Sequence, residues 1–308
     1  MRIAVLGAGG VGGYFGARLA ASGNDVTFIA RGAHAQAMRE HGLQVLSPLG
    51  DLRLQPVKLH EDWRGTGLVD LVLVAVKMYD LEAAAAQLKP LLAADTAVVP
   101  FQNGVEAQAI LERVLGKRYV CGGTAYIAAA IERPGVIRHT GKGARLVFGE
   151  PYPTQSWRLE TLEAACRGAG IDCLLAPDIA VEVWRKFIFL APFAGITCFA
   201  RTSIGAVRED PALWGRFRSL VEEATAVARA SGVALPEGEE EQRLELARKL
   251  PTEMRSSMLH DLEAGKRLEL DWLTGAVVRL GAEHGVATPV SAEVYEALAP
   301  LRDGAPAA

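Results

Sequence analysis

Residues 2–12 read RIAVLGAGGVG, and the other elements of the chain can be placed by working outward from them. The apolar run at 2–6 predicts a buried strand, and residues 14–20 predict a helix that ends near Gly23. The intervening G-x-G-x-x-G is the turn by which a strand and a helix hold the pyrophosphate of a dinucleotide. A second apolar strand at 26–30 completes the unit. This stretch therefore predicts a dinucleotide-binding α/β domain.

The residues of this turn have separate expected tasks. Gly7 makes the tight turn, Gly9 lets the backbone approach the pyrophosphate, and Gly12 lets the helix lie close to the strand. Gly10 and Val11 complete the expected cofactor-binding set, and the N-terminus of the following helix offers unpaired N–H groups to the phosphates. Because 32 of the 308 residues are glycine, an ordinary glycine turn is the alternative. The flanking strand and helix favour cofactor binding.

The tip of the second strand predicts which dinucleotide is bound. An acidic residue about 20 residues after the fingerprint would bind the ribose 2′-OH and favour NAD. Residues 26–36 contain no acid, and Arg31 stands at the tip instead. A guanidinium pairs with a 2′-phosphate through two parallel hydrogen bonds. We therefore expect NADPH as the cofactor, the alternative being that Arg31 is only a solvated turn residue.

Composition narrows the class of protein. The length predicts two domains, and a net charge of −3 gives no basic field for nucleic acid or a membrane. The four cysteines show neither C-x-x-C nor zinc spacing, which indicates reduced thiols, a cytoplasmic protein and no metal site. The N-terminus reads as a strand and not as a signal peptide. The apolar stretch 187–200 contains Pro192 and is shorter than the roughly 20 residues that span a bilayer.

Strands and helices alternate as far as residue 175. Strands are predicted at 43–46 and 52–54 (a hairpin), 69–76, 97–101, 119–131, 136–139, 145–148 and 171–175, and helices at 81–92, 105–115 and 157–168. This alternation predicts a mostly parallel, doubly wound sheet. Later residues look helical, with helices at 211–231, 252–264 and 268–284. We therefore expect an α/β cofactor domain at 1–177 and an all-α domain at 178–308.

Three polar residues stand where chemistry is expected. Lys77 and Asn103 follow predicted strands, at the carboxyl ends where doubly wound sheets bind ligands. An amide can orient a nicotinamide or a substrate, but Asn-Gly is also a common turn dipeptide, and Lys77 can be a plain strand-end lysine. Lys186 precedes a strongly apolar helical stretch, which would lower its pKa toward that of a useful acid. By itself this pattern favours a snorkelling lysine.

Together these motifs identify a family. The chain resembles the ketopantoate reductase (2-dehydropantoate 2-reductase) family over nearly its whole length. The resemblance is carried by Gly7 to Gly12, Arg31, Val76-Lys77, Gln102-Asn103-Gly104, Trp184-Arg185-Lys186, Ser256-Ser257-Met258-Leu259 and Glu269-Leu270-Asp271. It implies a Rossmann-type domain followed by a helical domain for substrate and dimer contacts. It also implies NADPH-dependent reduction of a 2-oxo acid, foremost 2-dehydropantoate to pantoate in pantothenate biosynthesis.

The resemblance also assigns roles to single residues. It implies that Lys186 is the general acid that protonates the carbonyl oxygen, and that Asn103 lies beside nicotinamide and substrate. Lys77 would lie near the cofactor. Ser257 would hydrogen-bond the substrate carboxylate. Glu269 would help to hold the lysine or the cofactor in place.

The chain departs from the family at two substrate positions. The family carries asparagines four and eight residues after the lysine, on one helix face, and this chain has Leu190 and Ala194. The substrate lining is therefore more apolar, so a reductase of a related, more apolar 2-oxo acid is an alternative. A non-catalytic NADP-binding sensor is another. A dehydrogenase for hydroxyacyl or sugar-phosphate substrates would need basic or His-Glu groups that we do not find. A homodimer is left open.

Overall fold

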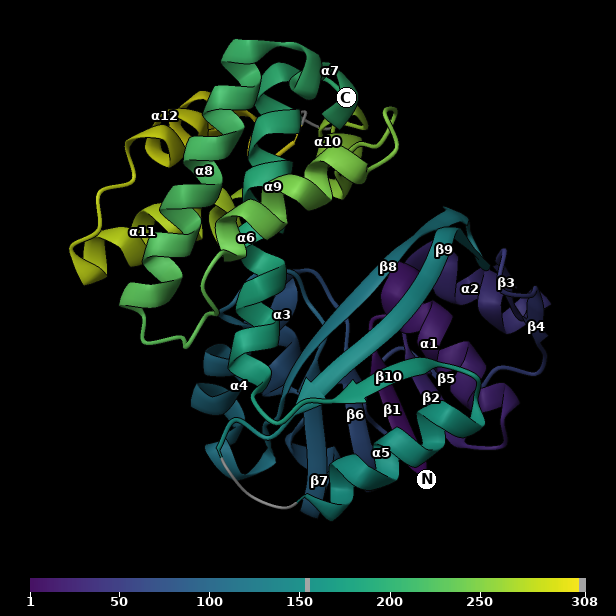
Figure 1. Ribbon diagram of the computed structural model, residues 1–308. Coiled ribbons are helices and arrows are strands. Elements are labelled where there is room, and N and C mark those ends of the chain that lie inside the picture. The colour runs from purple at the N-terminus through teal and green to yellow at the C-terminus, as the bar shows by residue number, and fades with distance from the viewer. Residues whose placement is uncertain (153–155, 305–308) are drawn as a thin grey trace. The chain divides into compact units, whose positions relative to one another are not determined.

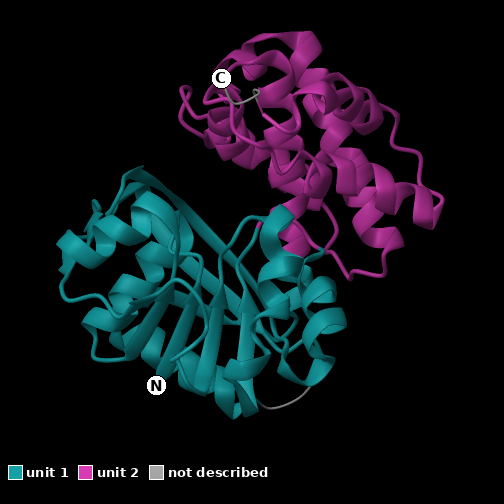
Figure 2. Ribbon diagram, turned by 180° about the vertical axis from the view of Figure 1, so that it is seen from behind, with its two compact units in different colours: residues 1–102, 106–182 teal, residues 103–105, 183–308 magenta. Residues whose placement is uncertain are grey.

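The computed structural model describes residues 1–152 and 156–304 (Figure 1). These residues form two compact units (Figure 2). The first comprises residues 1–102 and 106–182, and the second comprises 103–105 and 183–308. The division falls after Glu182, a few residues beyond the boundary expected at 177. The three residues 103–105 belong to the helical unit although they come only two residues after the end of a strand of the first unit.

The first sheet of unit 1 is parallel throughout, in the order β5-β2-β1-β6-β7. Its strands are β1 Arg2–Leu6, β2 Asp25–Ile29, β5 Leu59–His60, β6 Val69–Val74 and β7 Leu92–Pro100. Its helices are α1 Gly10–Ala21, α2 Gly32–His41, α3 Met78–Ala86 and α4 Ala107–Leu115. The strand order reverses at β1, so the fingerprint lies at the switch point where such sheets bind ligands. The predicted α/β fold is confirmed.

A second sheet in unit 1 corrects the expectation of one doubly wound sheet. Its order is β10-β9-β3-β4, with β8 paired to β9. The strands are β3 Leu43–Leu46, β4 Leu52–Leu54, β8 Gly122–Arg133, β9 Val136–Gly149 and β10 Asp172–Leu175, and α5 Trp157–Gly168 precedes β10. The tight turn at Pro134-Gly135 joins β8 and β9 as an antiparallel hairpin, which leaves no room for a crossover helix. Residues 136–139 and 145–148 are therefore parts of one long strand. The hairpin of β3 and β4 is confirmed.

The second unit is helical, as expected. It contains α6 Ile179–Ala200 except for the first four residues of that helix, which belong to unit 1. Its other helices are α7 Ile204–Glu209, α8 Pro211–Ala230, α9 Glu239–Lys249, α10 Ser257–Glu263, α11 Thr274–His284 and α12 Pro289–Leu298. The expected N-cap of α8 is confirmed, because the Asp210 carboxylate accepts from the backbone N–H groups of Ala212 and Leu213. Side chains of α6 are buried along most of its length, including Phe187, Ile188 and Ile196.

Three predicted helices have different bounds. The helix expected at 81–92 is α3, which ends at Ala86, before Pro90 in the 3-10 turn Lys89–Leu91. The helix expected from 252 begins only after Ser256, whose hydroxyl caps it. The helix expected at 268–284 is broken at Leu273, where φ is −109° and ψ is −96°. A 3-10 turn, Leu270–Trp272, precedes the break, and α11 follows it.

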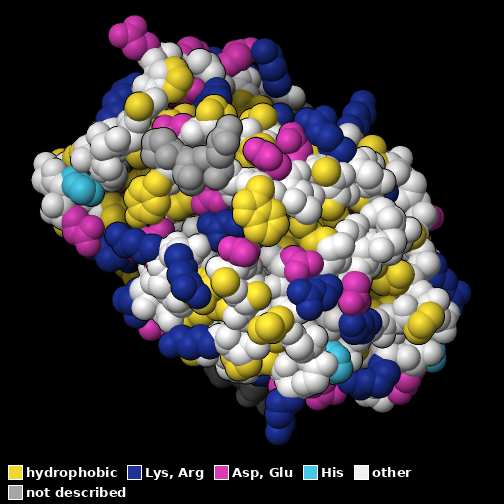
Figure 3. Space-filling model, turned by 90° about the horizontal axis from the view of Figure 1, so that it is seen from below, with side chains coloured by type: hydrophobic (Ala, Val, Ile, Leu, Met, Phe, Trp, Pro, Cys, Tyr) yellow, Lys and Arg dark blue, Asp and Glu magenta, His cyan; other side chains and the backbone are white. Residues whose placement is uncertain are grey.

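The distribution of charged side chains on the surface agrees with the small net charge of the chain. On the face drawn in Figure 3, basic and acidic side chains alternate among scattered hydrophobic ones. In the part of the chain that the structure describes, none of the helices combines the length and the apolar character that crossing a membrane requires.

Candidate active site

The fingerprint loop has the geometry of a pyrophosphate cradle. Gly7 adopts a φ of +94°, and its N–H donates to the carbonyl of Ile29, the last residue of the neighbouring strand β2. A Cβ on Gly12 would lie 2.0 Å from the Gly7 carbonyl oxygen, so only glycine lets α1 begin so close to the loop. A Cβ on Gly9 would have no described protein atom within 4 Å. The open side of the loop at Gly9 therefore fits a dinucleotide phosphate at the start of α1.

The other two fingerprint residues serve the packing of the loop. A Cβ on Gly10 would lie 2.1 Å from the Ala129 carbonyl oxygen, so the first turn of α1 rests directly on β8. Val11 is half-buried and packs against the core of unit 1. These contacts fix the direction of α1, whose N-terminus faces the open side of the loop.

Arg31 lies at the carboxyl end of β2, as the sequence analysis expects, and is the N-cap residue of α2. Its Nε donates to the Glu61 carbonyl at 3.2 Å, and its Nη2 donates to Gln87 Oε1 at 3.3 Å. The residue is exposed. Two of the five guanidinium donors thus hold the group in place, and because the residue is exposed, a phosphate can reach the guanidinium.

Lys77 lies at the same edge of the parallel sheet. It follows the end of β6 and is the half-buried N-cap residue of α3. The loop that carries it is tied to the fingerprint strand, because the Ala75 N–H donates to the Leu6 carbonyl at 2.8 Å. This placement agrees with a lysine near the cofactor.

Lys186 and Asn103 meet within unit 2. The Lys186 Nζ donates to Asn103 Oδ1 at 2.9 Å, which joins α6 to the segment that follows β7. Val105, two residues after Asn103, packs against the core of the helical unit. Burial lowers the pKa of Lys186 to about 8, while the nearby Glu269 carboxylate opposes this shift. A lysine that is bonded to an amide and has this pKa is suited to proton donation near neutral pH.

Glu269 and the neighbouring pair Ser256 and Ser257 also lie in unit 2. Glu269 is 5% exposed and precedes the 3-10 turn before α11. Ser257 is exposed in the first turn of α10. Ser256 is buried, and its hydroxyl bonds Thr197 Oγ1 of α6 at 2.8 Å and accepts from the Leu259 N–H. This role of Ser256 was not predicted from the sequence, although serine is among the residues preferred at helix N-caps.

Leu190 and Ala194 follow Lys186 on one face of α6 but differ in burial. Leu190 is half-buried, with part of its side chain at the surface of the helical core. Ala194 is 1% exposed and packs inside that core. Of the two expected lining positions, Leu190 is therefore the one whose side chain a substrate can reach in this packing.

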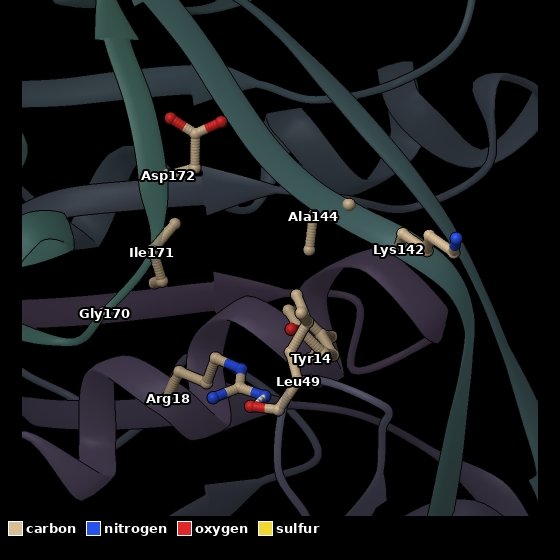
Figure 4. A pocket seen from close by; sticks show the side chains of 9 residues that line it. Tyr14, Arg18, Leu49, Lys142, Ala144, Gly170, Ile171 and Asp172 are labelled. Atoms are coloured by element: carbon tan, nitrogen blue, oxygen red, sulfur yellow. Dashed lines mark hydrogen bonds between the residues drawn. The ribbon is translucent and has the colours of Figure 1, made fainter.

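A hollow of about 250 Å³ opens elsewhere on unit 1 (Figure 4). It is lined from α1, β9 and the turn before β10, and the Arg18 guanidinium in it donates to the Leu49 carbonyl at 3.3 Å. Its lining contains none of the expected site residues. Within residues 1–152 and 156–304, no three His, Cys, Asp or Glu side chains gather to hold a metal ion.

Comparisons with known proteins agree with this arrangement. The family described as "Ketopantoate reductase PanE/ApbA" matches residues 3–152, and its C-terminal counterpart matches 178–302. The chain is 33% identical over 295 residues to "Uncharacterized oxidoreductase YkpB" of Bacillus subtilis, covering 96% of this chain and 97% of that protein. It is also 33% identical over 303 residues to a 2-dehydropantoate 2-reductase of Mesorhizobium japonicum, covering 91% of each.

Solved structures show the same fold. A PanE/ApbA family ketopantoate reductase from Ralstonia eutropha JMP134 has a TM-score of 0.90 and 32% identity, covering 98% of each chain. D-mandelate dehydrogenase, solved with NADH and anilino(oxo)acetate, has a TM-score of 0.89 over 98% of each chain. At 23% identity that likeness concerns the fold alone. The matches to both halves show that the chain belongs to the ketopantoate reductase family and is an NAD(P)H-binding oxidoreductase that acts on CH–OH groups.

Proposed function

We propose that this protein reduces a 2-oxo acid to a 2-hydroxy acid with NADPH, and that 2-dehydropantoate is its substrate, as in pantothenate biosynthesis. The observation that carries the proposal is the 2.9 Å bond between Lys186 Nζ and Asn103 Oδ1, with a lysine pKa of about 8. Several relatives named 2-dehydropantoate 2-reductase, at 32–33% identity, support this substrate.

Reduction of a ketone needs a proton for the carbonyl oxygen. When bound, a reduced nicotinamide supplies the hydride for the carbonyl carbon. Lys186 gives its Nζ proton to the oxygen, so that negative charge does not accumulate there. Asn103 Oδ1 accepts one Nζ–H and so orients the ammonium, while the buried Glu269 carboxylate favours its protonated form.

The choice of NADPH is supported by Arg31. Its guanidinium is held at the end of β2 by the Glu61 carbonyl and Gln87, and it is exposed. The fingerprint fits the pyrophosphate, since the space beside Gly9 is open. In this proposal the fingerprint loop and Lys77 hold the shared part of the dinucleotide, and Arg31 pairs with the 2′-phosphate.

The half-buried Leu190 favours a second candidate substrate, a more apolar 2-oxo acid. The residue lies one helical turn after Lys186 and offers no hydrogen bond to a substrate hydroxyl. D-mandelate dehydrogenase, solved with anilino(oxo)acetate, shares the fold. In both candidates Ser257, exposed on α10, bonds the substrate carboxylate.

NADPH oxidation against a panel of branched 2-oxo acids tests these proposals. A preference for 2-dehydropantoate of more than about a hundredfold in kcat/KM supports the pantothenate assignment and eliminates the apolar candidate. If an unhydroxylated branched acid is preferred, Leu190→Asn should shift the ratio toward 2-dehydropantoate by about tenfold. Tight NADPH binding without turnover of any 2-oxo acid would favour a sensor and overturn the enzyme assignment.

We also propose a cellular location for the protein and a division of its chain into two functional domains. The four cysteines are free and buried, which supports the cytoplasm as its location. Residues 1–177 would bind the cofactor, and residues 178–308 would bind the substrate and make the contacts of a homodimer. Analytical ultracentrifugation of the purified protein tests the dimer.

A further inference from the structure

His34 bonds two backbone segments that lie far from it in sequence. The residue is part-buried in the first turn of α2. Its Nε2 lies 2.9 Å from the Ala8 carbonyl oxygen of the fingerprint loop. The N–H of Gly135, in the turn between β8 and β9, donates to its Nδ1 at 3.1 Å. One imidazole thus joins the fingerprint loop, α2 and the tip of a long hairpin.

These two bonds determine the state of the ring. A backbone N–H can only donate, so Nδ1 must be the unprotonated acceptor. A carbonyl oxygen can only accept, so Nε2 must carry the proton and donate to Ala8. The ring is therefore neutral, with its hydrogen on Nε2. Burial lowers the pKa of His34, although the bond to Ala8 opposes this, so the neutral ring is favoured at pH 7.

The three segments are close-packed at this point. A Cβ on Gly135 would lie 3.2 Å from the Ala37 Cβ, so the hairpin tip rests on α2, beside which Figure 1 shows it. A Cβ on Gly13 would lie 2.9 Å from the Ala8 carbonyl oxygen, so that carbonyl also lies against α1. Ala8 itself is 3% exposed and stands between Gly7 and Gly9. The Ala8 carbonyl belongs to the peptide group that joins Ala8 to Gly9. Its direction therefore determines how that peptide is oriented at the open side of the loop.

We propose that His34 is a positioning residue of the cofactor site, which holds the fingerprint loop in its phosphate-binding conformation by tying the Ala8 carbonyl to the β8–β9 turn. It acts on the loop and does not touch the phosphate. This inference rests on the NAD(P)H site of unit 1 and is independent of the choice between NADPH and NADH.

The test compares dissociation constants for NADPH and NADH, measured by titration calorimetry without substrate. His34→Ala should weaken both dinucleotides by about tenfold, since it leaves the buried Ala8 carbonyl unpaired. His34→Gln should restore binding to within about threefold, because one amide offers an acceptor to Gly135 and a donor to Ala8. His41→Ala, an exposed histidine on the same helix, is the matched control and should bind as the wild type does.

A role in fold stability alone predicts a different pattern. Wild-type affinity in His34→Ala would overturn the proposal, and so would His34→Gln binding as weakly as His34→Ala. If His34→Ala fails to fold, the proposal is tested by ¹⁵N NMR of the wild-type His34 ring at pH 7, which reports which ring nitrogen carries the proton. An unprotonated Nδ1 with a protonated Nε2 supports the proposal, and the reverse tautomer or a charged ring overturns it. Equal wild-type affinity for NADPH and NADH would overturn only the proposed role of Arg31.

Discussion

The candidate site in unit 1 and the candidate site in unit 2 are built in opposite ways. In unit 1 the proposed phosphate cradle is made by backbone within residues 7–12, and its shape depends on glycines, which have no side chain. In unit 2 the proposed proton donor depends on side chains from three distant stretches, at residues 103, 186 and 269. The first can be recognised from a short motif, because neighbours in sequence are neighbours in space. The second exists only once α6 and the segment after β7 are packed together.

The largest effect on the rate of reduction should come from removing Lys186, the proposed proton donor. Lys186→Ala should lower kcat by about 10² to 10⁴, the usual loss for a general acid, with little change in NADPH affinity. Steady-state kinetics and a separate binding titration measure the two quantities. Lys249→Ala, an exposed lysine on α9, is the control and should change neither. Near wild-type kcat in Lys186→Ala would mean that Lys186 has no part in the chemistry.

Two glycines of the cradle should respond differently to the same added methyl group. Gly12→Ala forces a Cβ against the Gly7 carbonyl and should destabilise the fold by about 1–3 kcal/mol. Gly9→Ala meets no described protein atom, so it should leave stability unchanged and weaken NADPH binding on the order of tenfold. Thermal unfolding and calorimetry separate these effects. Unchanged NADPH affinity in Gly9→Ala would show that the cofactor does not use this side of the loop.

A smaller and more selective effect is expected at Arg31. The wild type should bind NADPH at least about tenfold more tightly than NADH, and Arg31→Ala should remove the difference without affecting NADH. Arg39→Ala, on the same helix and paired with Glu61 at 3.0 Å, is the matched control. Loss of that exposed ion pair should cost little. Equal affinities in the wild type would leave Arg31 as a residue of the turn.

Much of unit 1 follows from local sequence. The fingerprint and Arg31 lie where the sequence predicts them, and the strand predicted at 69–76 is β6, which ends two residues earlier at Val74. Each depends on a short apolar run and its flanking turn. The second sheet was not foreseen. Residues 136–139 and 145–148 look like two strands in the sequence because Gly141 and Gly143 interrupt the apolar pattern. In the structure both segments pair with β8, so they form one continuous strand.

The contacts that assemble the site were less predictable. The bond between Lys186 and Asn103 joins residues 83 positions apart, and no local pattern contains it. On sequence alone Lys186 looked like a snorkelling lysine, and only the family resemblance gave it a role. Ser256 and His34 act through partners that are remote in sequence, at Thr197, Ala8 and Gly135. Their tasks become visible only in the folded chain.

The pH dependence of reduction tests the central claim most directly. With a pKa of about 8, Lys186 carries its proton below that pH and loses it above. If it is the acid, kcat/KM for the 2-oxo acid at saturating NADPH should be level near neutrality and fall about tenfold per pH unit above about pH 8. A rate that stays level to pH 10, where an ordinary lysine is still mostly charged, would contradict a Lys186 of lowered pKa donating the proton.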